Sequence, residues 1–445
     1  MGLFDIFKKQ DDNSPAKEDL TKAKEHFSKG EFQETLRTLA WGFKKDVDYK
    51  PLYKLAADSL EKLNAADEQK LFEAINKNIK DSNAFHNLGD FYFSVGHYDL
   101  AQTFYEKTLQ LNPNNEEAPH DLAISYARRF QVSKAVEVLT NCRSNDFWNL
   151  YFLNKCKILD KKVEGVHVAI MNLQTFLDEQ PNQDDVDIPK MKVKELQETL
   201  QRFSTVPDIQ THIRDWQFIQ YGGAVLDYFE DGEGGDHVAG GRYVASWGSN
   251  GSIKTIANKL KQFANKLSIS FQGIVSLSDR DSEIIGRLLA KEFGVSFNFY
   301  KPTNTNQDCL IVCSDSSHFA GVEELITIQN GQIVFSLNHS WLDSSIVSPD
   351  IIGFMTQTYT FPWTGGGMRV IDMESRNIER IPPDDRSAEE IATDIFNIRQ
   401  PQEDINKHLE FYAERKNYLK GIGKQTNNKR YNFMIESPVP GSYFG

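Results

Sequence analysis

The sequence predicts a chain of two parts, in which an α-helical solenoid is followed by a mostly parallel, three-layer α/β domain. Three observations support this fold class. Small and aromatic residues recur in the first half with a period of about 34 residues. Strands and helices alternate in the second half, as they do in parallel sheets. The composition is that of a globular protein, with 40% hydrophobic and 25% charged residues.

Length and charge exclude several classes of protein. A chain of 445 residues corresponds to roughly three domains of about 150 residues. Lysine and arginine number 50 against 63 aspartates and glutamates, a net charge of −13, which argues against nucleic-acid binding. We find no apolar run of about 18 residues and expect no stable membrane insertion. Four cysteines make no disulfide framework, which favours the cytoplasm.

The clearest repeat unit runs from residue 83 to 113. Its sequence is NAFHNLGDFYFSVGHYDLAQTFYEKTLQLNP. Gly89 and Ala101 are small where two antiparallel helices would touch, and aromatic residues such as Tyr92 and Tyr105 would fill the space around that contact. Pro113 would end the second helix. The pattern predicts a pair of packed helices.

The same pattern recurs in register. Ala101, Ala135 and Ala169 are equally spaced, although the third unit is degraded around Cys156. Upstream, small and apolar residues of the segment 23–39 fall at matching positions of the repeat. Residues 51–75 have helical periodicity but match the repeat only loosely and only if its phase is shifted. We therefore predict four or five helix pairs, closed by a capping helix near 191–203.

This pattern resembles the tetratricopeptide repeat, in which Leu-Gly, Tyr, Ala, an aromatic residue and Pro follow one another over about 34 residues. The resemblance covers a little under half of the chain. It implies a solenoid whose concave groove, lined by the first helix of each pair, holds a partner protein or peptide. It is nearly silent on chemistry, because such arrays carry many functions.

The resemblance also implies groove positions in three repeats, of mixed charge: His86, Asn87, Asp90, His120, Asp121, Ile124, Arg128, Asn154, Lys155 and Lys162. This mixture departs from the basic clamp with which some family members hold chaperone C-terminal carboxylates. Taken singly, each of these residues is more often only part of a solvated polar face. Concave solenoid surfaces are, however, usually binding surfaces.

The second half alternates strands and helices after residue 203. We expect strands at 271–278, 295–300, 308–314 and 332–341, and helices at 252–267, 281–294 and 318–331. Residues 368–381 read as a hairpin, and Ser387 and Glu390 form a capping box that opens a helix. The predicted divisions are a flexible N-terminus (1–15), the array (16–203), the α/β domain (204–400) and a C-terminal helix and tail (401–445).

Two loops after predicted strands are candidate ligand sites, since ligands of open α/β sheets bind beyond the carboxyl ends of strands. They contain Asp279, Arg280, Asp281 and Ser282, and Asp315, Ser316 and Ser317. Arg280 could pair with a phosphate. The alternative is that Asp281 or Ser282 only caps a helix and Asp279 lies in a turn.

This second half is faintly similar to type I phosphoribosyltransferases, but the paired acids and Thr-Thr-Gly of that family's catalytic loop are absent. The sequence contains no second Cys or His pair at zinc-ligand spacing and no G-x-S-x-G nucleophile elbow of a hydrolase. It also lacks the Walker A signature of a phosphate-binding loop. Cys309 and Cys313 fit core thiols. We thus predict no metal, no cofactor and no catalytic residue.

The sequence favours a non-enzymatic scaffold or adaptor that binds a partner segment in the groove. The alternative makes the α/β domain an enzyme or a sensor for a phosphorylated or nucleotide-like molecule. The partner and the oligomeric state are not predicted.

Overall fold

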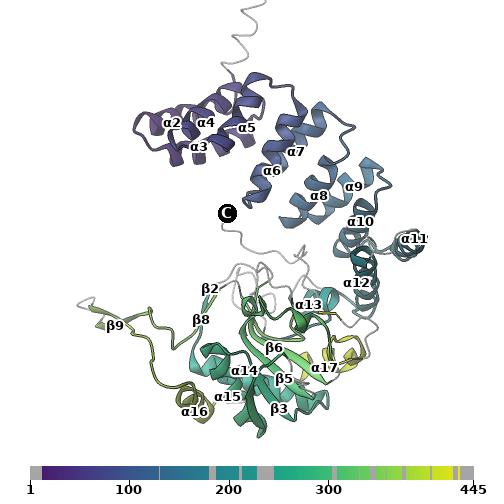
Figure 1. Ribbon diagram of the computed structural model, residues 1–445, viewed down its shortest axis with the longest axis vertical. Helices are drawn as coiled ribbons and strands as arrows, with labels where there is room; N and C mark the ends of the chain where they lie inside the picture. The colour runs from purple at the N-terminus through teal and green to yellow at the C-terminus, as the bar shows by residue number, and fades with distance from the viewer. Residues whose placement is uncertain are drawn as a thin grey trace, which may run out of the picture. The chain divides into compact units, whose positions relative to one another are not determined.

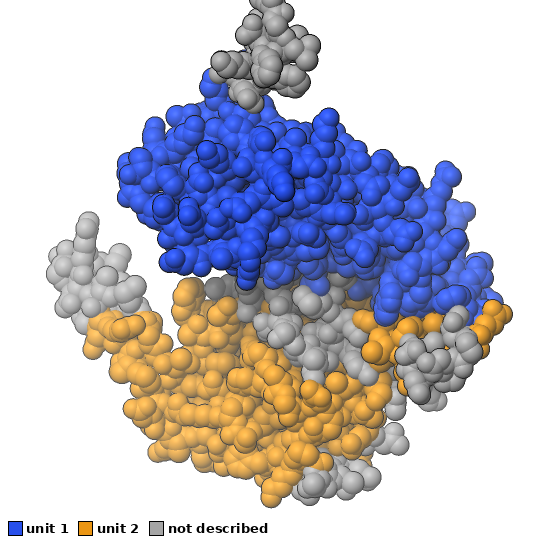
Figure 2. Space-filling view, turned by 45° about the horizontal axis from the view of Figure 1, so that its top comes forward, with its two compact units in different colours: residues 1–176, 445 blue, residues 177–444 orange. Residues whose placement is uncertain are grey.

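The computed structural model divides into two compact units, residues 1–176 with 445 and residues 177–444 (Figures 1 and 2). The residues described are 13–129, 131–179, 187–209, 213–227, 245–302, 308–329, 331–340, 347–356, 358–372, 377–400, 403–423 and 429–430. Most of the N-terminal segment predicted to be flexible, and the tail from 431, lie outside this part of the chain.

The first unit is a series of helix pairs (Figure 1), and each helix between residues 17 and 159 packs on its neighbour along the chain. The helices are α2 (Lys17–Ser28), α3 (Phe32–Lys45), α4 (Lys50–Lys62), α5 (Ala66–Lys77), α6 (Ser82–Ser94), α7 (Tyr98–Leu111), α8 (Ala118–Arg128), α9 (Val132–Cys142), α10 (Phe147–Leu159) and α11 (Val166–Asp178). The predicted solenoid is confirmed.

Small residues set the distance between paired helices, as the sequence predicts. A Cβ atom added to Gly89 of α6 would lie 2.6 Å from the ring of Tyr105 of α7. Ala101 is fully buried in the same contact. Tyr105 can therefore pack closely against the backbone of α6, where its hydroxyl donates a hydrogen bond to Asp90 Oδ1 at 2.8 Å.

Helix α12 (Asp187–Ser204) falls in the second unit, whereas the sequence placed it at the end of the array. The reason is its buried Arg202, whose guanidinium donates to the carbonyls of Ile219 and Gln220 at 2.8 Å each. Those carbonyls belong to the C-terminal end of α13 (Ile213–Tyr221), where a cation is favoured.

The second unit is built on a parallel sheet of six strands in the order β1-β7-β6-β5-β3-β4. The strands are β1 (Ala224–Asp227), β3 (Gly273–Ser276), β4 (Ser296–Phe299), β5 (Cys309–Asp315), β6 (Gln332–His339) and β7 (Ile351–Met355). The predicted parallel α/β class is confirmed. After β3 the chain runs first to β4 on one side and then to β5 on the other, so the topological switch point lies between β3 and β5.

The sheet is covered differently on its two faces. Helix α15 (Arg280–Phe293) packs on β3, β4 and β5, and helix α14 (Asn250–Lys266) packs on α15 and β1. On the other side of β3, β5 and β6, alternate strand residues form a core with Phe319 and Leu325. These two belong to short 3₁₀ turns, η1 (Ser316–Phe319) and η2 (Glu323–Ile326). The helix predicted at 318–331 is therefore wrong, because Gly321 adopts a positive φ of 91° and interrupts it.

The remaining elements follow the sequence more closely. β9 (Met368–Asp372) and β10 (Asn377–Arg380) form the predicted antiparallel hairpin. The capping box of Ser387 and Glu390 opens α16 (Ala388–Asn397). β2 (Ala245–Trp247) pairs with β8 (Thr358–Thr360), and α17 (Asn406–Glu414) leads into a last turn, η3 (Lys416–Tyr418). Among the described residues, no helix is long and apolar enough to cross a membrane.

Candidate functional site

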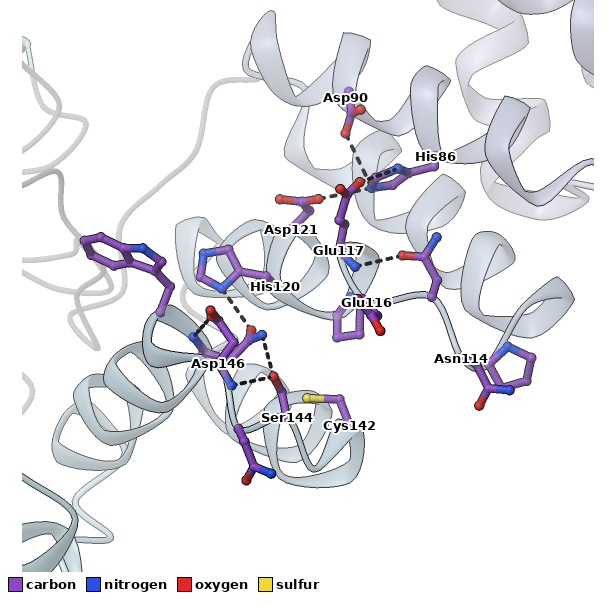
Figure 3. Close-up of a pocket in the computed structure, with 16 residues that line it drawn as sticks. His86, Asp90, Asn114, Glu116, Glu117, His120, Asp121, Cys142, Ser144 and Asp146 are labelled. Carbon is purple, nitrogen blue, oxygen red and sulfur yellow. Dashed lines mark hydrogen bonds and ion pairs between the residues drawn. The ribbon is translucent and has the colours of Figure 1, made fainter. Parts of the chain in front are cut away.

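A cavity of about 1050 Å³ opens on the first unit beside α6, α8 and the start of α10 (Figure 3). Residues from these helices and from the loops that precede α8 and α10 line it: His86, Asp90, Pro113, Asn114, Asn115, Glu116, Glu117, Pro119, His120, Asp121, Cys142, Ser144, Asn145, Asp146, Trp148 and Asn149. α6, α8 and α10 are each the first helix of a pair, so the cavity lies in the predicted groove.

Local capping shapes the two loops of this cavity. The Asn115 side chain accepts hydrogen bonds from the amides of Glu117 and Ala118, at 3.0 and 2.7 Å, and so positions the start of α8. Asp146 caps α10 by accepting from the amide of Asn149 at 3.0 Å. Because each cap fixes the first helical turn, the side chains of that turn have a defined direction towards the cavity.

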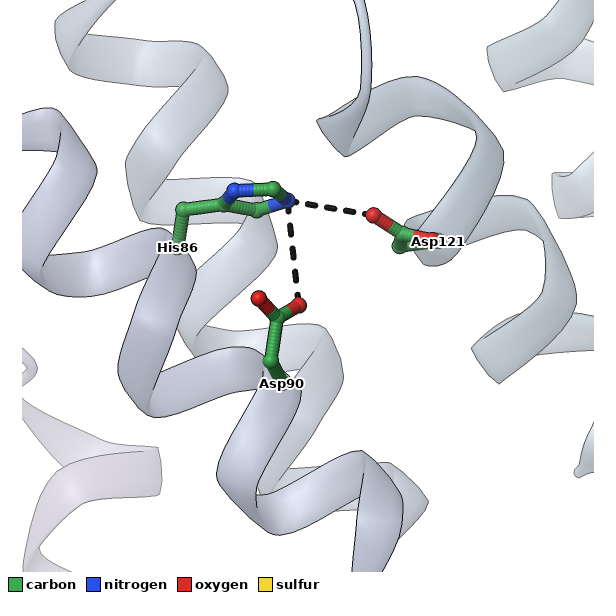
Figure 4. Close-up of side chains that lie close together, drawn as sticks. All are labelled: His86, Asp90 and Asp121. Atoms are coloured by element: carbon green, nitrogen blue, oxygen red, sulfur yellow. Dashed lines mark hydrogen bonds and ion pairs between the residues drawn. The ribbon is translucent and has the colours of Figure 1, made fainter.

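His86 is the best-connected polar residue in the cavity. It lies one helical turn before Asp90 on α6, and both face α8 (Figure 4). Its Nε2 atom is 3.1 Å from Asp121 Oδ2 and 3.8 Å from Asp90 Oδ1, while its Nδ1 atom is 3.9 Å from Glu117 Oε2. The hydrogen bond to Asp121 raises the pKa of His86 above its ordinary value of 6.5, against the effect of burial. The site therefore stabilises positive charge.

A second histidine is held by neutral groups. His120 Nδ1 is 3.1 Å from Asn149 Oδ1, and Asn149 donates to the hydroxyl of Ser144 at 3.1 Å. These contacts join α8 to α10 without a carboxylate. The two histidines of the cavity thus differ in surroundings, which makes His120 a matched control for His86.

The structure brings four of the predicted groove residues together in the cavity: His86, Asp90, His120 and Asp121. The others lie elsewhere. Asn154 lines a smaller cavity of about 170 Å³ with residues of α10 and α11. Arg128 lies over the ring of Tyr98 at 5.9 Å, and the exposed Lys162 pairs with Asp160 at 2.6 Å. Asn87, Ile124 and Lys155 are not among the residues that line either cavity.

Sequence reasoning missed the loop residues of the cavity. The repeat pattern assigns positions on helices only, so it could not select Glu116, Glu117, Asp146 or Trp148. One signal was present in the sequence. Asn115 and Asp146 stand just before predicted helices, and a helix-capping residue at that place indicates that its neighbours project beside the next helix.

The two predicted ligand loops of the second unit converge at the switch point. Asp279 follows β3 and caps α15, and His318 lies in η1 after β5. Asp279 Oδ2 is 3.3 Å from His318 Nδ1, and the hydroxyl of the buried Ser314 lies 3.3 Å from Asp279 Oδ1 and 3.2 Å from that of Ser282. The helix cap is Asp279, so the expectation that Asp281 or Ser282 caps this helix is wrong.

The other loop residues bond to the protein itself. Arg280 donates to the carbonyls of Asp384 and Arg386, and Asp281 accepts from the indole of Trp363 at 2.6 Å. Asp315 accepts from Ser317 and Asn338, at 2.6 and 2.7 Å, and the buried Ser316 contacts His339 Nδ1 at 2.8 Å. These hydrogen bonds stabilise the loops, and the guanidinium of Arg280 is turned to a different segment. The ligand hypothesis stays a prediction.

Asp279 and His318 predict a pH dependence of stability. Burial by itself would raise the pKa of Asp279, but hydrogen bonds from His318 and Ser282 lower it to about 2. The hydrogen bond to Asp279 raises the pKa of His318 above 6.5. The pair therefore stabilises the fold fully between about pH 4 and 6.5. This contribution is lost as the pH falls through 2 or rises through the folded-state pKa of His318.

We expect His318→Gln to lower the thermal midpoint of the second unit more at pH 5 than at pH 9. Differential scanning calorimetry of both proteins at the two pH values measures this difference. An equal loss at both pH values would show that the ion pair contributes nothing.

The fold and the cavity define a helical-repeat protein with an appended α/β unit. Residues 82–115, which contain α6 and α7, match the family model described as tetratricopeptide repeat. The chain thus carries a tetratricopeptide repeat at the place where the sequence pattern is clearest. Cys309 and Cys313 are buried in the second unit, as expected of core thiols.

The chain is similar to several proteins with curated sequences or solved structures, of which three serve as examples. An uncharacterized protein, ycf37 of Pyropia yezoensis, is 38% identical over 61 residues, which are 14% of this chain and only 34% of ycf37. A structure of MamA from Desulfovibrio magneticus, from residue 41 to the end, is 15% identical, with a TM-score of 0.24, over 38% of this chain and 99% of the chain in that structure. YrrB, titled a TPR protein with an unusual peptide-binding site, is 14% identical, with a TM-score of 0.23, over 41% of this chain and 94% of YrrB.

Proposed function

We propose that this protein is an interaction scaffold, whose groove binds an extended segment of a partner protein and whose cavity receives a basic side chain of that segment. The observation that carries the proposal is the charge of the cavity. Five carboxylates line it (Asp90, Glu116, Glu117, Asp121 and Asp146), and its lining residues include no lysine or arginine. The four free cysteines fit a reducing compartment such as the cytoplasm.

The exposure of these groups supports binding of a cation. The side chains of Glu117 and Asp90 are 81% and 52% exposed, so both carboxylates are accessible to a ligand. Trp148, which is 41% exposed, adds an indole surface to the same cavity. A lysine or arginine placed between carboxylates and an indole gains both ion pairing and cation–π attraction. An acidic segment would be repelled.

A random peptide library tests this proposal directly. We expect peptides selected on the full chain to be enriched in lysine and arginine, and their binding to weaken as salt is added. Peptides selected on the double variant Glu117→Gln, Asp146→Asn should no longer be enriched in lysine and arginine.

The control removes equal charge elsewhere. Asp67→Asn, Glu73→Gln changes two exposed acids on α5, the second helix of its pair, and should select the same basic peptides as the unchanged chain. If both double variants behave alike, the selection reflects only the net negative charge, and the cavity is not the binding site.

A further inference from the structure

Three side chains of the cavity form a cluster of metal-ligating type. His86, Asp90 and Asp121 each offer one ligand atom, and these atoms all lie within 4.8 Å of one another (Figure 4). His86 and Asp90 come from one face of α6, and Asp121 comes from α8 of the next helix pair. The cluster therefore joins two repeats.

The separations between the atoms suit a small divalent ion. Zinc lies about 2.0–2.2 Å from imidazole nitrogen and carboxylate oxygen in a tetrahedron, which places neighbouring ligand atoms about 3.4 Å apart. The distances from His86 Nε2 are 3.1 Å to Asp121 and 3.8 Å to Asp90, on either side of that value. Because Asp90 is half-exposed, its carboxylate can close the remaining gap.

Outer groups orient the ligands as they do in protein metal sites. The buried Tyr105 donates a hydrogen bond to Asp90 Oδ1, and its ring lies 5.5 Å from that of His86. Glu117 Oε2 faces the other imidazole nitrogen, His86 Nδ1, at 3.9 Å. This distance is too long for a hydrogen bond, so Glu117 adds negative charge near the imidazole and stays available for the partner segment.

The negative charge around His86 is larger than the positive charge that one proton on its imidazole adds. The groups that face His86 are Asp90 on α6, Tyr105 on α7, Asp121 on α8 and Glu117 just before α8. One proton on His86 offsets one of these three carboxylates. A divalent ion held by a neutral imidazole offsets two, and its open coordination position would face the cavity.

We propose that His86, Asp90 and Asp121 bind one Zn²⁺ ion in the groove. Imidazole with two carboxylates suits Zn²⁺, and Co²⁺ binds such ligand sets with lower affinity and reports on them by its visible absorption. The proposed ion site does not depend on the partner segment, because all three ligands belong to this chain. A bound ion would occupy Asp90 and Asp121 and leave Glu116, Glu117 and Asp146 for the segment.

Calorimetric titration of the full chain with Zn²⁺, after removal of any affinity tag and treatment with EDTA, tests the site. We expect one Zn²⁺ ion to bind. The variant His86→Ala should bind Zn²⁺ more than tenfold more weakly, since loss of an outer partner of a metal ligand alone costs about 10–100-fold. Asp90→Asn should also weaken binding, and this exposed residue can change without loss of the fold. Binding should weaken at acid pH, where a proton competes for His86.

His120→Ala is the matched control, because His120 lines the same cavity without a carboxylate partner and its loss should leave Zn²⁺ affinity unchanged. Visible absorption of the Co²⁺ form should show a tetrahedral spectrum that His86→Ala abolishes. Ion binding that is equal in His86→Ala and in the unchanged chain would overturn the proposal. These titrations contain no peptide, so their failure is distinct from failure of the basic-segment proposal.

Discussion

Replacing Arg430 by methionine is expected to destabilise the second unit by about 3–5 kcal/mol, because it leaves a buried carboxylate without its partner. Arg430 and Asp350 are both fully buried, and the guanidinium donates to both carboxylate oxygens at 2.8–2.9 Å. Arg430 Nη2 also donates to the carbonyl of Gln332 at 2.7 Å. Burial raises the pKa of Asp350 even with Arg430 present, so the desolvated charge is costly once that partner is gone.

Two comparisons identify the cause of this loss. The double variant Asp350→Asn, Arg430→Met retains an acceptor for the amide of Val334 and removes the charge, so it should be more stable than Arg430→Met alone. Arg386→Met breaks exposed ion pairs with Asp384 and Asp394 and should change little. Hydrogen exchange of the amides in β6 and β7 measures the stability of the second unit in all three variants. A double variant as unstable as the single one would rule out the charge as the cause.

The sequence could not reveal this contact. Arg430 lies 80 residues beyond Asp350 and in a segment that reads as a polar tail, where an arginine is ordinarily solvated. Its burial depends on the return of the chain to β6, with the amide of Arg430 bonded to the carbonyl of Ile326. Ion pairs between distant segments leave no periodic trace, so pattern reasoning cannot find them.

The helical half was predictable because its packing is local. The spacing of Gly89, Ala101 and Ala135 records which positions touch the neighbouring helix, and the structure places all three in buried contacts. The parallel sheet was predictable for a similar reason, since strands such as β5 and β6 are buried on both faces and read as apolar runs.

The candidate sites were predicted less well than the fold. His86, His120 and Asp121 were selected from helix positions, but the acidic character of the cavity comes from loop residues such as Glu116 and Asp146. The groove inferred from helices alone is mixed in charge because it includes Arg128 and Lys155, which do not line the cavity. Charge at a binding site therefore depends on which loops fold beside the helices, and a repeat pattern does not encode that.

Phe104→Ala is expected to cost the first unit about 3–5 kcal/mol, the usual cost of deleting a large aromatic side chain from a core. Phe104 of α7 is fully buried, and its ring centroid lies 5.4 Å from that of Tyr92 and 5.6 Å from that of Phe43. Tyr92 belongs to the same helix pair, but Phe43 belongs to α3, two pairs earlier in the chain. The repeat pattern selects its neighbour Tyr105, which packs within the pair, and gives no weight to Phe104.

This difference between neighbours predicts how the damage spreads. Stability in a solenoid is the sum of repeat and interface terms, so loss of Phe104 should weaken α3 to α7 together. Phe176→Ala, a change at a side chain that is 48% exposed, should have little effect anywhere. Hydrogen exchange resolved by helix distinguishes the cases. A loss confined to α6 and α7 would show that Phe104 acts only within its own pair, and that the contact with Phe43 contributes nothing to the stability of the array.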